Sequence, residues 1–383
     1  MLIIMSKNRE KYSTDPFGKK HAPRRSFFGM LLVIILMALT LSFSVALLIA
    51  YITPYVSPSA FGSLTIVGLF APILFICVAA CMLMWIVLGY WKTAAAVLLL
   101  LLPGIFRFTD FYSIDLMREV EEKAERSSFT LMSYNVRAFG DDAGEPMLDS
   151  LVNFMASSDL AEVVCFQEFK RNAKGIERLD SLFNRRYKRC YKSDVEEYSG
   201  VVLRTYSCYP IIASGEISSL GRGTTQWNDI VVRNDTLRIF NNHLNSTDLT
   251  ASDSEDIGSG EILGDSERML SIVDRIANNS TIRAEHVDTL RHVIDNTPYE
   301  SIVCGDFNDT PMSYVYRELS RDLVDAFVEQ GRGYGYTFRP MHGMLRIDYI
   351  LHSKGLSSLY YYANEHANFS DHLPIVARLK FNE

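Results

Sequence analysis

Six short polar segments, each beside an apolar run, contain the residue types that metal-assisted hydrolysis requires. Together they hold four carboxylates, two amides and two imidazoles, namely Glu168, Asp306, Asp348, Asp371, Asn135, Asn308, His243 and His372. Each of them alone resembles an ordinary turn, cap or surface residue. Strand ends at one edge of a sheet converge in space, so we expect all eight side chains to line one pocket.

The chemistry of this set follows from its charge. Four carboxylates in one pocket repel each other unless a cation or protonation relieves the repulsion. Asp, Glu and Asn oxygens are hard ligands, and two histidines without a cysteine do not form a typical zinc cage, so the set predicts Mg²⁺, with Mn²⁺ as a substitute. A sparsely ligated Mg²⁺ keeps waters and binds phosphate oxygen, which indicates phosphate-ester hydrolysis rather than acyl transfer.

The polar segments lie among short runs rich in β-branched and aromatic residues, which predict strands. These runs cover residues 129–135, 162–166, 229–232, 236–241, 301–304, 347–351 and 375–381. Apolar residues at helical spacing occur between them, at 147–155, 269–277, 284–294 and 314–319. Strands outnumber helices and alternate with them irregularly, which predicts an α/β sandwich with mixed sheets. The acidic stretch 246–266 is predicted to be a long mobile loop.

Charge is distributed very unevenly along the chain. Residues 1–25 hold seven basic and two acidic side chains, whereas no Asp, Glu, Lys or Arg occurs from Phe27 to Trp91. About 20 apolar residues cross a bilayer as a helix, so we expect spans at 27–52 and 64–88. A third apolar run, 93–106, is shorter and contains a proline. The remainder, from residue 107, carries a net charge of −13.

These boundaries predict four regions: a basic cytoplasmic tail (1–26), two to three transmembrane helices (27–107), a linker (108–127) and a catalytic domain (128–383). Basic residues favour the cytoplasmic side of a membrane, which places the N-terminus inside. If the third run spans, the catalytic domain faces away from the cytoplasm, the arrangement we favour; if it only dips into the bilayer, the domain is cytoplasmic. Cys190 and Cys208 could pair in an oxidising compartment, a connectivity that sequence leaves open.

In order and context the polar segments resemble the endonuclease/exonuclease/phosphatase family, whose fold is like that of deoxyribonuclease I. The matching residues are Asn135, Gln167-Glu168, His243-Leu244, Gly305-Asp306-Phe307-Asn308, Asp348 and Ser370-Asp371-His372. The apolar spans and the late Arg346-Ile347-Asp348-Tyr349 also resemble a membrane-anchored bacterial branch. The resemblance implies a four-layer α/β/β/α sandwich of two mixed sheets behind the helices. It also implies a multi-pass protein of the bacterial inner membrane with an outward-facing domain.

The resemblance further implies a divalent-metal site. Glu168 would be the principal metal ligand. Asn135 and Asp371 would complete or support the site, and the ion would be Mg²⁺ or, as a substitute, Mn²⁺.

It also implies the catalytic roles. Asp306 would orient or deprotonate the attacking water, and Asn308 would hold a phosphate oxygen. His372, fixed by Asp348, would stabilise charge on the scissile phosphate. His243 would bind phosphate or help to protonate the leaving oxygen.

The substrate is less closely specified than the reaction. Proteins that bind nucleic acid neutralise backbone phosphates with Lys and Arg, so the acidic domain argues against tight duplex binding but not against nuclease-like hydrolysis of phosphodiesters. The alternative is a phospholipid or sphingomyelin phosphodiesterase or a phosphoinositide phosphatase, which a membrane anchor would suit. A second alternative is a non-catalytic tethered binding module, against which the full set of acidic and histidine residues argues. The expected partners are a phosphate ester and the lipid bilayer, and no protein partner is inferred.

Overall fold

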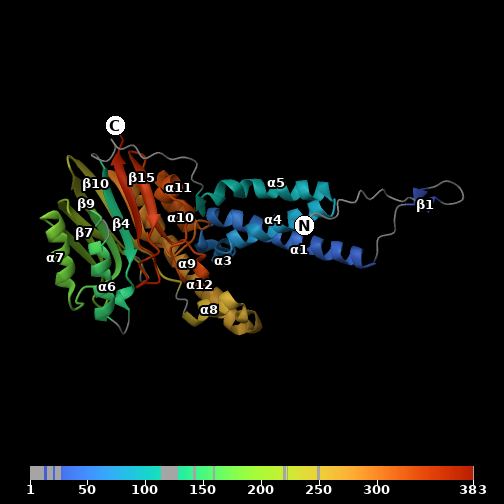
Figure 1. Cartoon of the computed structure of the whole chain (residues 1–383), viewed down its shortest axis with the longest axis horizontal. Coiled ribbons are helices and arrows are strands. Elements are labelled where there is room, and N and C mark those ends of the chain that lie inside the picture. Colours follow the sequence, from blue (N-terminus) through green and yellow to red (C-terminus); the bar gives the residue numbers. More distant parts are fainter. Residues whose placement is uncertain are drawn as a thin grey trace.

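The computed structural model describes residues 13–14, 20–21, 27–113, 128–140, 144–157, 160–218, 221, 223–247 and 251–382. Figure 1 shows a β-sandwich flanked by helices, with a bundle of helices projecting from one side. Most of the predicted basic tail and residues 114–127 of the predicted linker lie outside the described residues. Within these two regions the structure describes β1 (Ser13–Thr14), β2 (Lys20–His21) and β3 (Tyr112–Ser113).

Two six-stranded sheets form the sandwich. Sheet 1 has the strand order β15-β16-β4-β5-β7-β6, and sheet 2 has the order β12-β14-β11-β10-β9-β8. Strand β4 pairs parallel with β5, and β10 pairs parallel with β11, whereas the remaining pairs are antiparallel. Both sheets are therefore mixed, as the sequence predicts. Their strands are β4 (Ser128–Asn135), β5 (Val163–Lys170), β6 (Tyr191–Tyr198), β7 (Val201–Ser207), β8 (Ile211–Ser218), β9 (Thr224–Val232), β10 (Asp235–His243), β11 (Glu300–Asp306), β12 (Leu323–Asp325), β14 (Asp348–Ser353), β15 (Leu356–Ala363) and β16 (Ile375–Phe381).

Alternation along the strands builds three apolar layers. In β4, Phe129 and Leu131 enter the core between the two sheets, while Met132 and Tyr134 enter the core on the outer face of sheet 1. That outer face is covered by α6 (Gly144–Ser157) and α7 (Ile176–Tyr187), and the outer face of sheet 2 by α9 (Ser266–Asp295) and α10 (Tyr314–Ser320). The four-layer α/β/β/α sandwich expected from the resemblance is confirmed.

One local prediction for this region is wrong, and two predicted helical segments belong to one helix. The acidic stretch 246–266 is not one loop, because it contains α8 (Ala251–Ser259) and the 3₁₀ turn η4 (Glu261–Gly264). Buried Asp253 forms ion pairs with Arg268 at 3.1 Å and Arg275 at 2.8 Å, which hold this segment against α9. The two helices predicted at 269–277 and 284–294 form the single helix α9. The remaining short elements are η3 (Arg137–Phe139), α11 (Ala326–Gln330), β13 (Gly333–Tyr334) and α12 (Pro340–Gly343).

The projecting bundle consists of α1 (Phe27–Ile52), α4 (Ala71–Val87) and α5 (Trp91–Phe108), joined by η1 (Thr53–Tyr55), α2 (Pro58–Phe61) and α3 (Leu64–Leu69). Two segments, Phe27–Tyr55 and Trp91–Phe108, are long and apolar enough to cross a membrane by length and composition. The second predicted span, 64–88, is not continuous. The chain leaves helical geometry at Phe70, and Pro72 occupies the first turn of α4, where its missing N–H costs nothing.

The bundle is docked onto the sandwich rather than joined to it by the linker alone. The segment η1–α3 packs on α9 and α10, and Thr281 of α9 donates to the Pro58 carbonyl at 3.1 Å. At the end of α5, β3 pairs with β13, and Arg346 donates to the Asp110 carbonyl at 2.9 Å. The helical region therefore meets the same part of the sandwich in which Asp348 lies.

Candidate active site

The polar strand ends meet at one edge of the sandwich. Asn135 ends β4, Glu168 lies near the end of β5, His243 ends β10, and Asp306 ends β11. The neighbouring β4–β5 and β10–β11 pairs are parallel, so their carboxyl ends face the same way. A pocket of about 250 Å³ opens there, and among the residues that line it are Arg137, Glu168, His243, Asp306, Asn308, Asp371 and His372.

Irregular backbone geometry directs two of these side chains, those of Glu168 and Asn308, toward the pocket. In β5 the pairing with β7 shifts register between Phe166 and Phe169, and Glu168 has φ of +50°. Asn308 follows β11 with φ of +51°. Bulges re-aim side chains out of the two-residue alternation, and left-handed backbone is uncommon for residues other than glycine, so such strain concentrates at functional sites. The backbone at Glu168 and Asn308 thus turns both residues to the pocket.

Gly305 explains why a glycine precedes Asp306. Its φ is +124°, and a Cβ there would lie 2.0 Å from the carbonyl oxygen of Asn242 on the neighbouring strand β10. Only glycine permits this close approach of the two strands. Asp306 therefore lies directly opposite His243, with which it pairs at the end of β10.

Asn135 joins two carboxylates. Its Nδ2 donates to Glu168 Oε1 at 3.0 Å and to Asp306 Oδ2 at 3.1 Å, while its Oδ1 accepts from the backbone N–H of Arg137 at 2.9 Å. Ser370 fixes the same residue from the other side by donating to the Asn135 carbonyl at 2.8 Å. The oxygens of Glu168 and Asp306 are thereby held next to each other.

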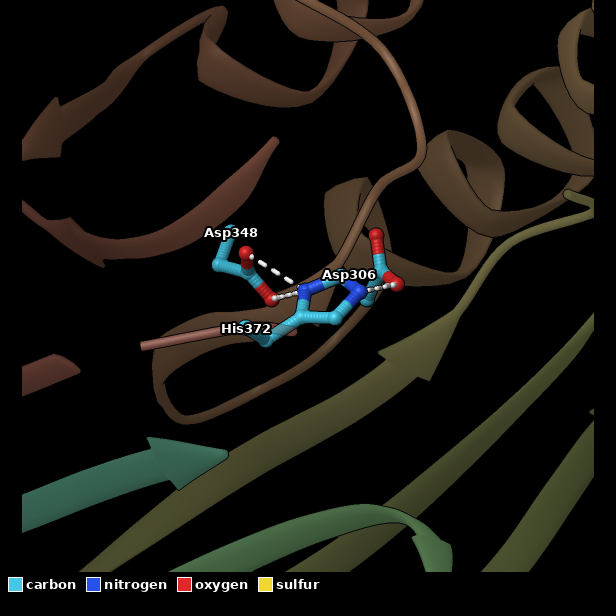
Figure 2. A group of neighbouring side chains, drawn as sticks. All are labelled: Asp306, Asp348 and His372. Atoms are coloured by element: carbon cyan, nitrogen blue, oxygen red, sulfur yellow. Dashed lines mark hydrogen bonds and ion pairs between the residues drawn. The ribbon is translucent and has the colours of Figure 1, made fainter. Parts of the chain in front are cut away.

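The ring of His372 lies between two carboxylates, as Figure 2 shows. Its Nδ1 contacts both oxygens of Asp348, at 3.1 and 3.0 Å, and its Nε2 lies 3.6 Å from Asp306 Oδ2. Burial opposes charge on the ring, but the carboxylates of Asp348 and Asp306 outweigh it and raise the pKa of His372 to about 10. The two carboxylates therefore favour the charged form of His372, and Asp348 holds the orientation of the ring. The backbone N–H of Asp348 in turn donates to Thr337 Oγ1 at 3.0 Å.

His243 has an equivalent arrangement with a residue that the sequence analysis missed. Its Nδ1 contacts Glu197 Oε2 at 2.5 Å, and its Nε2 lies 3.6 Å from Glu168 Oε1. The other Glu197 oxygen accepts from the backbone N–H of Glu168 at 3.1 Å. Burial opposes charge on this ring too, but Glu197 and, to a smaller extent, Glu168 and Asp306 raise the pKa of His243 to about 10.

Asp306 is a fully buried carboxylate of the pocket. Its Oδ1 accepts from the backbone N–H of Asn308 at 2.8 Å. Burial raises the pKa of Asp306 to about 6, even though His372 opposes the rise. The Asn308 amide lines the pocket and donates to the Leu244 carbonyl at 3.0 Å.

Asp371 is placed differently from the other predicted ligands. It lies in the pocket wall, where its Oδ2 is 3.5 Å from Arg137 Nη1, and Ser370 Oγ is 3.4 Å from its Oδ1. Six of the eight predicted side chains thus line the pocket, whereas Asn135 and Asp348 do not line it but contact residues that do. Asp371 lies beside a cation, and it meets Asn135 through Ser370.

The residues fit a divalent cation. The carboxylates of Glu168, Glu197, Asp306 and Asp348 outnumber the imidazoles of His243 and His372, an excess of acidic groups that a cation can balance. Oxygen donors of this kind suit Mg²⁺ or Mn²⁺. Asp306, Asp348 and His372 offer ligand atoms within 4.8 Å of one another. However, a charged His372 has no free lone pair for a metal, whereas Glu168 offers a carboxylate oxygen that the Asn135 amide holds beside Asp306.

Comparisons with known proteins identify two regions of the chain. Residues 132–372 match the model of the endonuclease/exonuclease/phosphatase family, and residues 25–111 match a domain of unknown function, DUF8431. No curated protein matches the sequence.

Several solved structures are similar in fold. The catalytic domain of human Nocturnin, solved with a bound sulfate anion, has a TM-score of 0.50 at 14% identity and covers 67% of this chain and 95% of its own. A family protein from Leptotrichia buccalis has a TM-score of 0.48 at 16% identity and covers 66% of this chain and 100% of its own. The family match spans more than half of the chain and includes Glu168, His243, Asp306 and Asp348. This chain therefore belongs to the endonuclease/exonuclease/phosphatase family, a family of metal-dependent phosphoric ester hydrolases.

Proposed function

We propose that this chain is a membrane-anchored, Mg²⁺-dependent phosphoesterase that hydrolyses phosphodiester bonds by in-line attack of water. The observation that carries the proposal is the hydrogen-bonded set Asn135–Glu168–Asp306, flanked by two histidines that are each held by a carboxylate. In-line attack on phosphorus needs a positioned water, positive charge at the phosphate and assistance to the leaving oxygen. The pocket offers a group for each requirement.

Glu168 is the principal metal ligand in this proposal, and Asn135 and Asp371 support the site. Asn135 sets the distance between Glu168 and Asp306 through its shared amide. A bound Mg²⁺ would supply positive charge at a phosphate oxygen. Mn²⁺ would act as a substitute because it has similar ligand preferences.

The remaining side chains perform the proton and charge chemistry. Asp306 orients the attacking water and accepts its proton, and Asn308 donates to a phosphate oxygen. The His372 imidazolium, oriented by Asp348, stabilises negative charge on the phosphate. His243, oriented by Glu197, binds phosphate or gives its proton to the leaving oxygen. A bond forms between the water oxygen and phosphorus, and the phosphorus–oxygen bond to the leaving group breaks.

We further propose that α1, α4 and α5 anchor the chain in a bilayer, in the bacterial inner membrane by resemblance, with the tail 1–26 in the cytoplasm. The sandwich docks at the end of the bundle where α1 ends, α4 begins and α5 ends (Figure 1). That arrangement supports three crossings and an extracytoplasmic domain 128–383. The test is labelling of Lys354→Cys, at a side chain 71% exposed, by an impermeant thiol reagent on intact cells. If labelling occurs only after lysis, the catalytic domain lies on the cytoplasmic side of the membrane instead.

The full chain, purified in nanodiscs, tests the activity. It should hydrolyse bis(p-nitrophenyl) phosphate with Mg²⁺ or Mn²⁺ and stop with EDTA. Glu168→Gln, which removes a charge without changing size, should lower kcat by about 10³-fold, the scale of other transition-state charge contacts. Glu196→Gln is the matched control, because Glu196 lies on β6 in the same sheet, beyond β7, and pairs with Arg171 at 2.6 Å. Equal activity of Glu168→Gln and Glu196→Gln would contradict the assignment of Glu168 as a metal ligand.

A further inference from the structure

A second pocket, of about 340 Å³, adjoins the active-site pocket and has a different character. Its walls are almost entirely apolar and include Ile73 and Ile76 of α4, Phe108 of α5, Tyr334 of β13 and Met344. Its volume lies within the range of pockets that bind small molecules. The helical bundle and the sandwich thus form this apolar pocket together.

The two pockets are neighbours with a common wall. Leu69, at the end of α3, and Leu345, which follows α12, line both of them. A ligand that passes over these two side chains could place a polar group beside His372 and an apolar group beside α4. The helical region contributes directly to the catalytic pocket through Leu69.

The walls of the apolar pocket are held in place by the docking of bundle and sandwich. The Tyr334 hydroxyl donates to the Met344 carbonyl at 2.5 Å, and the backbone N–H of Gly335 donates to the Phe111 carbonyl at 2.9 Å. Tyr334 also pairs with Tyr112 in the β13–β3 ladder. A pocket that exists before its ligand arrives avoids the ordering cost that weakens binding.

One side of the apolar pocket faces the surroundings of the bundle. Ile73 and Ile76 lie in the first turns of α4 and are 41% and 63% exposed. If α4 lies in a bilayer, these turns are at the membrane surface nearest the sandwich. The hydrocarbon chain of a lipid can then enter the pocket sideways while its phosphate stays at the level of the head groups.

From these contacts we propose that the substrate is a membrane amphiphile that carries a phosphodiester. Its phosphate occupies the active-site pocket, and one of its hydrocarbon chains occupies the apolar pocket beside α4. This inference rests on the proposed phosphoesterase function and names the substrate class of the same site. A soluble nucleic acid would use the first pocket alone.

The test compares two substrates with the same scissile bond, methyl p-nitrophenyl phosphate and hexadecyl p-nitrophenyl phosphate, hydrolysed by the full chain in phosphatidylethanolamine/phosphatidylglycerol nanodiscs with Mg²⁺. Hydrolysis of either ester releases p-nitrophenol and leaves the alkyl group on the phosphate. We expect kcat/KM to be at least tenfold higher for the hexadecyl ester. Ile76→Trp and Met344→Trp, which fill the apolar pocket, should abolish that preference and leave hydrolysis of the methyl ester unchanged.

Val87→Trp is the matched control, because Val87 is 79% exposed at the far end of the same helix. It should keep the preference, which separates occupancy of the pocket from partition of the long-chain ester into the bilayer. Equal hydrolysis of both esters, or a preference that survives in both pocket variants, would overturn the inference and leave the phosphoesterase proposal intact. Failure to hydrolyse either ester would instead overturn the phosphoesterase proposal.

A binding measurement decides the question without turnover. Hexadecyl phosphate with a diazirine in mid-chain, incorporated in the same nanodiscs and irradiated, should label peptides that contain Ile73, Phe108 or Met344. Ile76→Trp should suppress this labelling, whereas Val87→Trp should not. Uniform labelling along α1, α4 and α5, unaffected by Ile76→Trp, would contradict the proposed chain site.

Discussion

The active-site pocket and the helical bundle bury polar groups in opposite ways. In the pocket, Asn135, His243 and His372 each contact carboxylates, and these contacts connect the two sheets. The interior of the bundle is almost wholly apolar, and its buried polar contacts include a hydrogen bond of 2.9 Å from Trp85 Nε1 to Thr40 Oγ1. Directional bonds determine the geometry of the pocket, whereas apolar packing holds the bundle together. Changes of single polar atoms should therefore affect the first region far more than the second.

The strongest test of this contrast is His372→Ala. Removing the imidazolium should lower kcat by roughly 10²- to 10³-fold, with a much smaller rise in KM, because the charge acts mainly in the transition state. Steady-state kinetics on bis(p-nitrophenyl) phosphate measure both constants. His292→Ala, at an exposed histidine of α9, is the control. A change confined to KM would assign His372 to substrate binding alone.

Glu197→Gln should have the next largest effect. Glu197 contacts His243 and the backbone N–H of Glu168, so its loss should misplace both and lower kcat/KM by roughly 10- to 100-fold, as is usual for groups that orient functional side chains. The pH profile of kcat/KM should also change, because His243 loses the carboxylate that favours its charged form. An unchanged profile together with full activity would make Glu197 a purely structural residue.

A buried group outside the pocket provides a pH-dependent stability test. His286 of α9 contacts Thr225 of β9 at 3.0 Å, and burial lowers its pKa from 6.5 to about 4. Between those pH values the unfolded chain binds more protons, so stability is fully present above about pH 6.5 and falls as the pH decreases, by up to about 3 kcal/mol near pH 4. The melting temperature should therefore drop less steeply with acidification in His286→Gln than in the natural sequence. Parallel curves would contradict this linkage.

The smallest effect should come from the bundle. Thr40→Val keeps the shape of the side chain but removes the acceptor for the buried Trp85 Nε1, which should cost about 1 to 3 kcal/mol because this N–H is left without a partner. We expect a lower melting temperature in nanodiscs and unchanged hydrolysis. A large loss of activity in this variant would show that the bundle interior is coupled to the pocket and would break the contrast between the two regions.

The sequence predicted much of the site because its chemistry is concentrated in short segments at strand ends. Asp306 and Asn308 lie at the end of a buried strand, and Asp348 begins another. Because strand ends at one edge of a sheet lie close together, the sequence alone predicted that these residues share a site. Glu197 was missed because it lies where the β6–β7 register shifts, between Glu196 and Tyr198, and a regular two-residue period cannot show which side a bulged residue faces.

The helical region was predicted less well than the pocket. Composition revealed three apolar runs, but the break at Phe70 follows a helix, α3, that packs against α9, a tertiary contact that hydropathy does not describe. In the same way the acidic composition of 246–266 indicated a loop, whereas the ion pairs of Asp253 with two arginines of α9 order this segment. The shared wall at Leu69 also arises only from docking.

The contact between Arg346 and the chain at the end of α5 has a practical consequence. Arg346 is buried, and its guanidinium binds the Asp325 carboxylate at 2.6 Å as well as the Asp110 carbonyl. A soluble fragment that starts after the helices would leave this cation with one partner fewer, uncover Met312, and cut the wall at Leu69 out of the catalytic pocket. The catalytic pocket of such a fragment would differ from that of the intact protein. Assays of substrate preference therefore need the full chain.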